Sequence, residues 1–253
     1  MLTGLYMSAA GLQTQEYRQS VTANNLANAQ TTGFKRDFAV MQARLNAAEA
    51  DPRMAAFRQP GLRQRSGGVW PGPGSIDLSQ GSLNQTGNQS DVALEGPGFF
   101  TLQGDKGEKL LTRDGRFLIN NDGYLINAAS GRKVLSVAGE PISLNPALPV
   151  HITNRGYVQQ GEGVSVQLGV VNTTADNLSK RGANIMAAED PTRVTPLADG
   201  AAVRQGFLEQ SAVDPVVEMV NMLEGQRVFE ANARMLTYQD QTLQQLNMIG
   251  RVA

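Results

Sequence analysis

The two ends of the chain share a pattern of hydrophobic and polar positions that the middle of the chain lacks. Residues 1–30 and 212–249 are rich in Ala, Gln and Asn and carry apolar side chains at helical spacing. The residues between them are dense in Gly, Pro, Asn and Thr and alternate over short runs, which indicates β-structure. We therefore predict an α+β fold with paired, coiled-coil-like terminal helices and a central all-β domain of short antiparallel strands.

This pattern divides the chain into three expected parts. Residues 1–33 and 212–253 form a terminal helical domain, residues 34–74 form a bridging segment, and residues 75–211 form the central β-domain. Helices at both ends of a chain that encloses a β-domain are suited to pairing with each other or with copies of themselves. That organisation points to assembly rather than to catalysis.

The apolar positions of the N-terminal helix form a thin and interrupted row. Leu2, Leu5, Ala9 and Leu12 follow the spacing of a coiled-coil seam, which lapses at Glu16 and Gln19 and resumes at Ala23 and Leu26. Helices obtain most of their stability from packing of an apolar face. We expect this helix to be labile in an isolated chain and ordered in an assembly.

A cluster of asparagines predicts where this helix ends. Asn24, Asn25 and Asn28 are poor residues for a helix interior, because their side chains compete for backbone hydrogen bonds, and Gly33 provides a permissive backbone for a turn. On these grounds alone, an ordinary polar helix end and a more specific role are equally supported.

The last helix has a clear start and a broad apolar face. Asp214 is suited to the N-cap, Pro215 to the first helical position, and Glu218 to the positive end of the helix dipole. Two adjoining apolar rows follow: Val216, Val220 and Leu223 in one, and Met219, Met222, Phe229, Ala233, Leu236 and Leu243 in the other. The width of this face is typical of a helix that packs among several others.

The central part predicts short strands joined by turns. The dipeptides Asp114-Gly115 and Asp122-Gly123 indicate hairpins, and the segment 70–74, Trp-Pro-Gly-Pro-Gly, indicates an irregular turn. Further strands are expected at 133–138, 149–153, 157–160, 164–172 and 201–208.

Composition and charge argue against several classes of function. The net charge of −1 lacks the basic field of a nucleic-acid-binding protein, and the chain has no Cys and a single His, His151. We therefore expect no catalytic residues, no metal site and no cofactor. Two alternatives have little support in the sequence. One is a phosphate or nucleic-acid site at Arg53, Arg58, Arg63 and Arg65, which no aromatic residues accompany, and the other is a calcium loop at Asn120, Asn121 and Asp122, which lacks the twelve-residue acidic pattern.

No run of about 18 apolar residues predicts a membrane-spanning helix. The first residues lack the basic start and the long apolar stretch of a cleavable secretory signal. If the protein leaves the cytoplasm, we expect it to leave by a route that does not cut its N-terminus.

Several motifs resemble one known family. The string from Ala23 to Lys35, ANNLANAQTTGFK, is similar to the N-terminal signature of the bacterial flagellar rod and hook family. A second signature runs from Gly206 to Asn232, through GFLEQSAVDP and QRVFEAN, and departs from the family only at Ala212, where Asn is usual. The runs DVALEGPGFF from Asp91 and TRDGRF from Thr112 also resemble the family.

The resemblance implies a structural subunit of the flagellar basal-body rod, not an enzyme. Such subunits stack helically into the drive shaft that carries torque from motor to hook, so the implied partners are other axial rod and hook-family subunits and the flagellar type III export apparatus, with no nucleic acid and no membrane insertion. The implied location is the basal body, periplasmic in a double-membraned cell.

The assembly interface is expected at ten residues: Leu5, Leu12, Leu26, Asn28, Gly33, Phe34, Met219, Leu223, Phe229 and Leu236. The short segment between Phe34 and Asp91 favours a proximal over a distal rod subunit, which stays the alternative. Outside this class, a secreted protein that uses its β-domain for binding or adhesion is the second hypothesis; it would keep its binding without residues 1–30.

Overall fold

The computed structural model describes residues 2–43, 68–105, 107–161, 163–196 and 202–249. The chain forms two compact units, and both are discontinuous in sequence. The helical unit comprises Met1–Leu26, Asp37–Ser75 and Pro215–Ala253, and the β unit comprises Ala27–Arg36 and Ile76–Asp214. The α+β class is confirmed, with a helix at each end and a strand-rich region between them.

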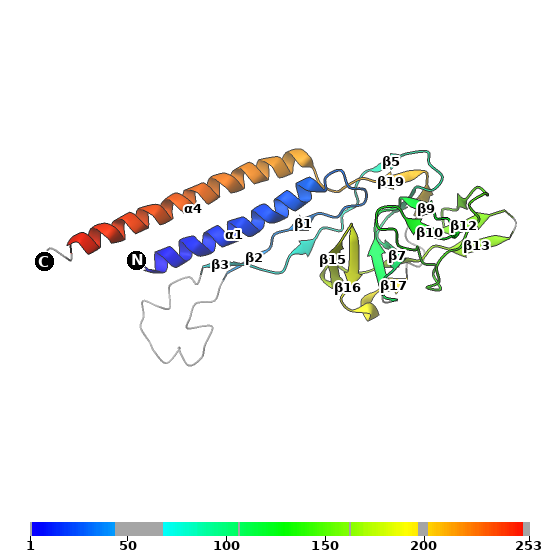
Figure 1. Cartoon of the computed structure of the whole chain (residues 1–253), viewed down its shortest axis with the longest axis horizontal. Helices are drawn as coiled ribbons and strands as arrows, with labels where there is room; N and C mark the ends of the chain where they lie inside the picture. Colours follow the sequence, from blue (N-terminus) through cyan, green and yellow to red (C-terminus); the bar gives the residue numbers. More distant parts are fainter. Residues whose placement is uncertain (1, 44–67, 106, 162, 197–201, 250–253) are drawn as a thin grey trace. The chain divides into compact units, whose positions relative to one another are not determined.

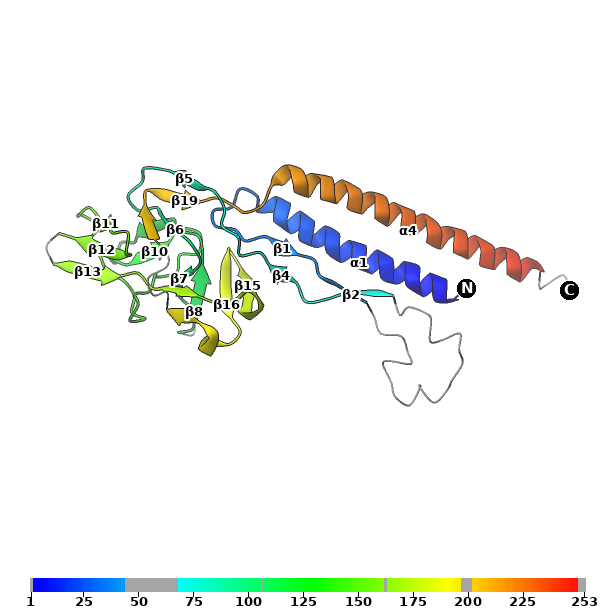
Figure 2. The same cartoon turned by 180° about the vertical axis from the view of Figure 1, so that it is seen from behind.

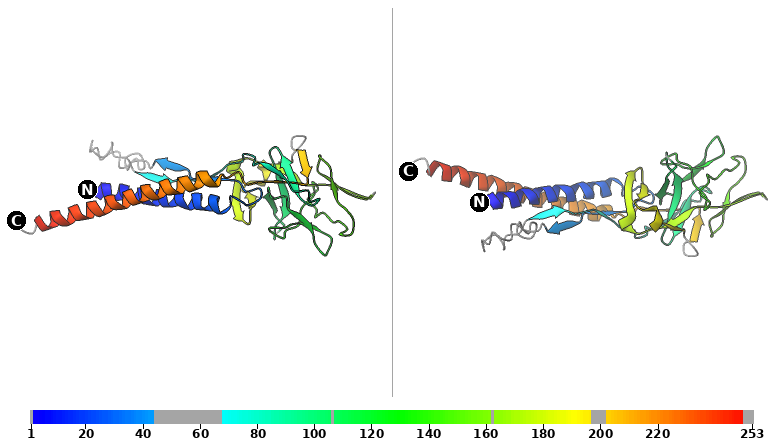
Figure 3. Two further views of the ribbon diagram at one scale, coloured as in Figure 1. Left: turned by 90° about the horizontal axis from the view of Figure 1, so that it is seen from above. Right: turned by 90° about the horizontal axis from the view of Figure 1, so that it is seen from below.

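Two long helices dominate the helical unit. Helix α1 (Leu2–Ala27) and helix α4 (Pro215–Ile249) lie side by side and run antiparallel (Figure 1; Figure 3). Both agree closely with the helices predicted at 1–30 and 212–249. Helix α1 ends at the asparagine cluster, where Thr31 N donates a turn hydrogen bond to Asn28 O at 3.0 Å.

Glycines allow α1 and α4 to approach closely. A Cβ atom placed on Gly11 would lie 3.5 Å from Nδ2 of Asn232, and one placed on Gly225 would lie 2.8 Å from Nε2 of Gln15. A Cβ atom on Gly4 would similarly lie 3.2 Å from Nε2 of Gln239. The polar side chain of one helix therefore occupies the space that a side chain on the other helix would need.

The buried side chains of α1 are polar. Thr14, Gln15, Thr22 and Asn25 are all buried, whereas Leu12 and Leu26 are only half-buried. Asn25 is held on both sides of its amide, because its Nδ2 donates to Asp37 O and its Oδ1 accepts from Asp37 N, each at 2.9 Å. Thr14 also donates a hydrogen bond, to Ala10 O at 2.6 Å, whereas the buried Nε2 of Gln15 has no hydrogen-bond partner in the described residues. The buried face of α1 is thus polar rather than a leucine seam.

Short strands accompany the helices in the segment after Arg36. Strand β1 (Asp37–Phe38) pairs with β4 (Ser75–Ile76), and β2 (Met41–Ala43) pairs antiparallel with β3 (Val69–Pro71), as Figure 2 shows. The irregular turn predicted at 70–74 is therefore partly wrong. Trp70 and Pro71 belong to β3. Proline is tolerated there because Pro71 is the last residue of the strand, so its missing N–H removes no hydrogen bond from the middle of the sheet.

A six-stranded antiparallel sheet forms the centre of the β unit. Its order is β15-β16-β8-β7-β14-β17. The bounds are β7 (Phe99–Gln103), β8 (Lys109–Thr112), β14 (Val170–Asn172), β15 (Leu178–Gly182), β16 (Ile185–Ala188) and β17 (Thr195–Pro196). Two 3-10 helices, η2 (Ala175–Asn177) and η3 (Pro191–Arg193), flank its edge strands.

Smaller antiparallel sheets complete the β unit. Three of them have two strands: β5 (Leu83–Gln85) with β19 (Phe207–Glu209), β6 (Val92–Glu95) with β18 (Ala202–Gln205), and β9 (Phe117–Ile119) with β10 (Leu125–Asn127). A three-stranded sheet contains β11 (His151–Ile152), β12 (Tyr157–Gln160) and β13 (Val164–Gln167).

The main hydrophobic core lies between these sheets. Phe100 and Phe117 meet edge to face with ring centroids 5.1 Å apart, which is a favourable aromatic geometry. Leu94, Leu102 and Leu168 are almost completely buried around them. A second, smaller cluster contains Ile76, Phe99, Leu111, Leu178 and Met186.

The strand predictions are confirmed in part. The strand expected at 157–160 is β12, whereas the strand expected at 164–172 is divided into β13 and β14. The division falls at Gly169, whose N–H donates to Leu135 O rather than to a neighbouring strand of its own run. Residues 133–136 form isolated bridges instead of the continuous strand expected at 133–138.

One of the two predicted Asp-Gly hairpins is confirmed. Asp122-Gly123 joins the paired strands β9 and β10, and Gly123 has a φ of 80°, which a glycine adopts easily. The hairpin predicted at Asp114-Gly115 is wrong, because β8 and β9 on its two sides belong to different sheets. The Asp114 carboxylate instead accepts hydrogen bonds from the backbone and side chain of Arg116.

Candidate functional site

Three ionic side chains meet in the interior of the β unit. Glu209 accepts hydrogen bonds from Lys35 Nζ at 2.7 Å and from Arg113 Nε at 2.5 Å, one on each carboxylate oxygen. The side chains of all three residues are only 1–2% exposed. We call Lys35, Arg113 and Glu209 the Glu209 cluster. Gly81 N also donates to the Glu209 carboxylate, at 3.1 Å.

The two cations of the Glu209 cluster also bind backbone carbonyls. Arg113 donates to the carbonyls of Leu94 at 3.1 Å, Gly96 at 2.6 Å and Gly98, and these three carbonyls surround the turn between β6 and β7. Lys35 donates to Ser79 O at 2.7 Å. The cluster therefore fixes backbone from several distant parts of the chain as well as joining three charges.

A close turn brings the segment after α1 onto this cluster. Gly33 has a φ of 67°, and its N–H donates to Glu209 O at 2.8 Å. A Cβ atom at Gly33 would lie 2.6 Å from the backbone carbonyl of Arg113, so a side chain cannot fit there. Lys180 secures the next residues, with its Nζ 2.6 Å from Lys35 O and 4.1 Å from the centre of the Phe34 ring.

The surroundings of Lys35 change its acidity. Burial lowers the pKa of Lys35 from its usual value by penalising the charged form, and the charge of Glu209 opposes this shift. Arg113 lowers the pKa of Lys35 further, whereas Asp77 raises it. Removal of water is thus the largest single influence on this ammonium group.

The Glu209 cluster has only a weak signal in the sequence. Lys35, Arg113 and Glu209 each lie inside one of the family-like strings, and Lys35 and Glu209 each follow an apolar residue, Phe34 and Leu208. A charged residue in such a setting can be buried with a partner, but no spacing rule joins positions 35, 113 and 209. Their meeting depends on the pairing of distant strands.

A second feature is the apolar surface of α4. Many of its large apolar side chains are exposed in the single chain: Val216, Val217, Met219, Val220, Leu223, Val228, Phe229, Met235, Tyr238 and Met248. Val216, Val220 and Leu223, which are 50–64% exposed, follow i, i+4, i+7 spacing and so form one stripe. By helical geometry this stripe lies opposite Gly225, which contacts α1.

The ten residues expected at the assembly interface fall into different settings. Met219, Leu223 and Phe229 are exposed on α4, and Leu236 on the same helix is half-buried. Leu12, Leu26 and Asn28 are half-buried at α1 or just after it. Gly33 and Phe34 are buried within the β unit, and Leu5 lies in α1, with its side chain outside the described part.

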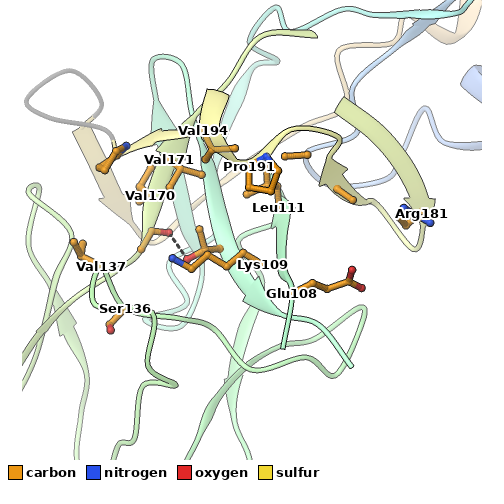
Figure 4. Close-up of a pocket in the computed structure, with 15 residues that line it drawn as sticks. Glu108, Lys109, Leu111, Ser136, Val137, Val170, Val171, Arg181, Pro191 and Val194 are labelled. Carbon is orange, nitrogen blue, oxygen red and sulfur yellow. Dashed lines mark hydrogen bonds between the residues drawn. The ribbon is translucent and has the colours of Figure 1, made fainter. Parts of the chain in front are cut away.

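The β unit also contains a cavity of about 480 Å³ over β7, β8, β14 and β16. Figure 4 shows Val170, Val171, Leu111 and Lys109 among the residues that line it. The Thr101 hydroxyl in its wall donates to Gly169 O at 3.0 Å and so serves the backbone. The ionisable side chains in its lining are Glu108, Lys109 and Arg181.

The residues of the less supported candidate sites either lie in ordinary strands and turns or fall outside the described residues. His151 is exposed on β11, and Asn120 and Asp122 belong to the β9–β10 turn. Arg53, Arg58, Arg63 and Arg65 lie outside the described residues. Within the described ranges, no three His, Cys, Asp or Glu residues are grouped as they would be to hold a metal ion.

Neither α1 nor α4, nor any other helix in the described residues, has the length and apolarity needed to cross a membrane.

Comparison with known families places three parts of the chain. Residues 5–35 match the family described as flagella basal body rod protein, and residues 93–179 match the flagellar hook protein FlgE/F/G D1 domain. Residues 204–249 match the flagellar basal body rod FlgEFG protein C-terminal family. The three matches follow one another in the order of the chain.

Individual relatives are similar over nearly the whole chain. The flagellar basal-body rod protein FlgG of Buchnera aphidicola subsp. Schizaphis graminum is 32% identical over 98% of this chain and 100% of its own length. FlgF of Caulobacter vibrioides is 35% identical over 93% of both chains, and FlgG of Bacillus subtilis is 30% identical over 99% of this chain and 100% of its own. This chain therefore belongs to the family of flagellar basal-body rod proteins.

Proposed function

We propose that this protein is a structural subunit of the bacterial flagellar basal-body rod. It assembles helically with other axial subunits into the drive shaft that transmits torque from the motor to the hook. The observation that carries this proposal is the exposed apolar stripe of α4 in a chain that belongs to the rod family. The relatives are named as basal-body rod proteins, and the proposed role extends that name to this chain.

The amount of apolar surface supports an assembly role. Soluble monomers rarely expose contiguous apolar patches above a few hundred Å², and larger patches mark interaction sites. Val216, Val220 and Leu223 continue into Met219 on the adjoining side of the helix, so the start of α4 presents a connected apolar surface. Burying this surface against neighbouring subunits would supply the main favourable free energy of assembly.

An open helical rod needs two different contact surfaces on each subunit. We propose that α4 contributes one surface through Met219, Leu223, Phe229 and Leu236. The second surface lies on α1, at Leu5, Leu12 and Leu26. Each surface would meet the other on a neighbouring subunit, and such contacts build an open helix when the rotation between subunits does not close into a ring.

The remaining predicted residues act at the junction after α1. Asn28 shares a hydrogen bond with Thr31, and Gly33 and Phe34 are buried within the β unit. We propose that these residues serve assembly by fixing the path of the segment that follows α1. Substituting them would change the path of the segment after α1, and would affect the contact surface only indirectly.

We propose a role in the rod for each of the three predicted parts of the chain. Residues 1–33 and 212–253 form the inner, coiled-coil-like part of the rod wall, residues 34–74 form the bridge, and residues 75–211 form the outer β-domain. The antiparallel contact of α1 and α4 at Gly11 and Gly225 supports the pairing of the two ends.

The proposed location is the basal body, in the periplasm of a double-membraned cell. The proposed route is the flagellar export apparatus, without a cleaved signal peptide. A purely structural role, with no catalysis, is supported by the family and by the hydrogen-bonded use of the polar groups in the cavity wall. We favour the proximal part of the rod over the distal part, which stays the alternative, and the relatives named FlgG and FlgF do not distinguish the two.

The experiment is to purify hook–basal bodies from the native cell and to locate this chain in them by mass spectrometry and electron microscopy. Density in the rod just above the membrane ring is the expected result. Density further out, below the hook, would make the protein a distal subunit. A protein found elsewhere and absent from basal bodies would contradict the rod role and favour a secreted binding protein.

A further inference from the structure

The Glu209 cluster joins residues that are far apart in the order of the chain. Its two cations come from positions 35 and 113, and its carboxylate comes from position 209. Glu209 lies on β19, which pairs with β5, and the preceding strand β18 pairs with β6. The anion is therefore delivered by the last two strands of the β unit.

Without Glu209, the β unit would enclose two positive charges. Lys35 and Arg113 have side chains that are only 2% exposed, and removing one partner of a buried ion pair leaves a charge that burial strongly disfavours. Asp77 lies close enough to act on Lys35, but it is half-buried, and Glu209 has the larger influence on that lysine. Neighbouring carbonyls bind both cations without cancelling their charge.

The cations cannot simply turn outward while the rest of the unit stays folded. Arg113 binds the carbonyls of Leu94, Gly96 and Gly98, and its own backbone packs directly on Gly33. Leu94 belongs to β6 and is 1% exposed, as part of the main core. Moving Arg113 to water would therefore release the turn between β6 and β7 and disturb the core beside it.

We propose that Glu209 is a folding checkpoint for the β unit. The charge imbalance of Lys35 and Arg113 keeps residues 27–36 and 76–196 from reaching a stable fold together until the segment containing β18 and β19 has docked. Docking of that segment supplies the missing carboxylate and completes the sheets β5–β19 and β6–β18. Helix α4 begins shortly after β19 in the chain. The proposal concerns folding and is independent of the proposed role in the rod.

The experiment measures amide hydrogen exchange in the full-length protein and in the variant Glu209→Gln. The amide keeps the shape of the side chain and removes its charge. We expect exchange to speed up by about 100-fold or more in β6, β7 and β8, far from the substitution, because loss of a buried ion partner destabilises the whole unit. Strands β18 and β19 should change by a similar factor.

The matched control is Glu95→Gln. Glu95 accepts a hydrogen bond from Arg204 at 2.6 Å on the neighbouring pair β6–β18, but both side chains are nearly half exposed. Exposed ion pairs contribute little, so exchange should change by only a few-fold at most. Faster exchange limited to residues 33–36 and 207–212 in the Glu209→Gln variant would overturn the proposal, because the effect would then be local.

A second variant, Lys35→Met with Glu209→Gln, separates charge from packing. Removing one of the two cations should slow exchange in β7 and β8 by at least about 10-fold relative to Glu209→Gln alone. If Glu209→Gln does not fold, the double variant decides the question. A folded double variant supports the checkpoint, and an unfolded one overturns it.

Discussion

At the scale of single residues, charge and backbone shape act together around Gly33. The glycine takes a left-handed backbone with a φ of 67° and brings its N–H to Glu209 O at 2.8 Å. This turn places Lys35 two residues later against the Glu209 carboxylate. One small residue thus decides where a buried charge is located.

Gly33→Ala tests the close approach to Arg113. The new Cβ would lie 2.6 Å from backbone atoms, so we expect the free energy of unfolding to fall by more than about 2 kcal/mol, in excess of the roughly 1–2 kcal/mol cost of a left-handed alanine. The control is Gly131→Ala, because Gly131 has the same φ of 67° and no atom within 4 Å of a Cβ atom. Equal losses in urea unfolding of the two variants would exclude a role for the contact.

The lowered pKa of Lys35 predicts a dependence of stability on pH. Burial, opposed by Glu209 and Asp77 and reinforced by Arg113, places the folded-state pKa of Lys35 below its unfolded value of 10.5. Between the two values the unfolded chain holds more protons on Lys35, so this group makes the unfolding free energy rise with pH. The destabilisation that comes from burying the Lys35 charge is fully present below the folded-state pKa of Lys35 and is absent above its unfolded-state pKa.

Lys35→Met removes this titration. We expect the stability of the natural protein, relative to that of the variant, to increase as the pH rises through the window just below 10.5. Urea unfolding at several alkaline pH values measures this difference. A difference that decreases with pH would mean that Glu209 outweighs burial at this lysine.

At the scale of elements, the two long helices meet through a polar contact and keep much apolar surface free. Gln15 and Asn232 fill the space beside Gly225 and Gly11, whereas Leu223 on α4 is 57% exposed. A polar contact between helices contributes little net free energy, because its groups exchange hydrogen bonds with water. The pair α1–α4 is therefore suited to gaining stability from further partners.

Gly225→Leu tests the helix pairing. Leucine is a good helix former, so α4 itself should persist, but its side chain would displace Gln15, whose Nε2 lies 2.8 Å from a Cβ atom at Gly225. We expect amide exchange in α1 to accelerate by about 10-fold, with no such change in the control Ala231→Leu, which lies at an exposed position of the same helix. Unchanged exchange in α1 would show that the contact adds no stability.

At the scale of the whole molecule, the exposed side chains of α4 form the surface through which we propose that the chain joins its neighbours. Leu223→Asp places a charge on the exposed stripe, and Leu12→Asp and Leu236→Asp place one at half-buried positions of α1 and α4. We expect each variant to be exported and to fail to enter rods, because burying an unpaired charge in an interface costs several kcal/mol. Swimming in soft agar and isolation of basal bodies measure this.

Gln241→Asp is the control for these three variants, because Gln241 is exposed on α4 and the charge change is the same. It should support normal swimming. Normal rods from the Leu223→Asp variant would remove α4 from the proposed interface. Normal rods from both Leu12→Asp and Leu236→Asp would contradict the coiled-coil-like pairing.

Local sequence patterns predict correctly those elements whose formation depends on residues close together in the chain. The helix before the asparagine cluster, the helix that begins at Pro215 and the Asp122-Gly123 hairpin all follow from capping, periodicity and turn chemistry within a few residues. The same reasoning failed at Asp114-Gly115, where the local turn signal is present but the flanking strands pair elsewhere.

The fold class and the helical ends follow from local periodicity and capping, and the family follows from the motifs. The meeting of Lys35, Arg113 and Glu209, the polar inner face of the helix pair and the exposure of the apolar stripe on α4 are visible only in the folded chain. Periodicity identifies a face of an element without identifying what covers it. Burial of a charge depends on contacts between residues that are distant in the chain, and no local preference encodes them.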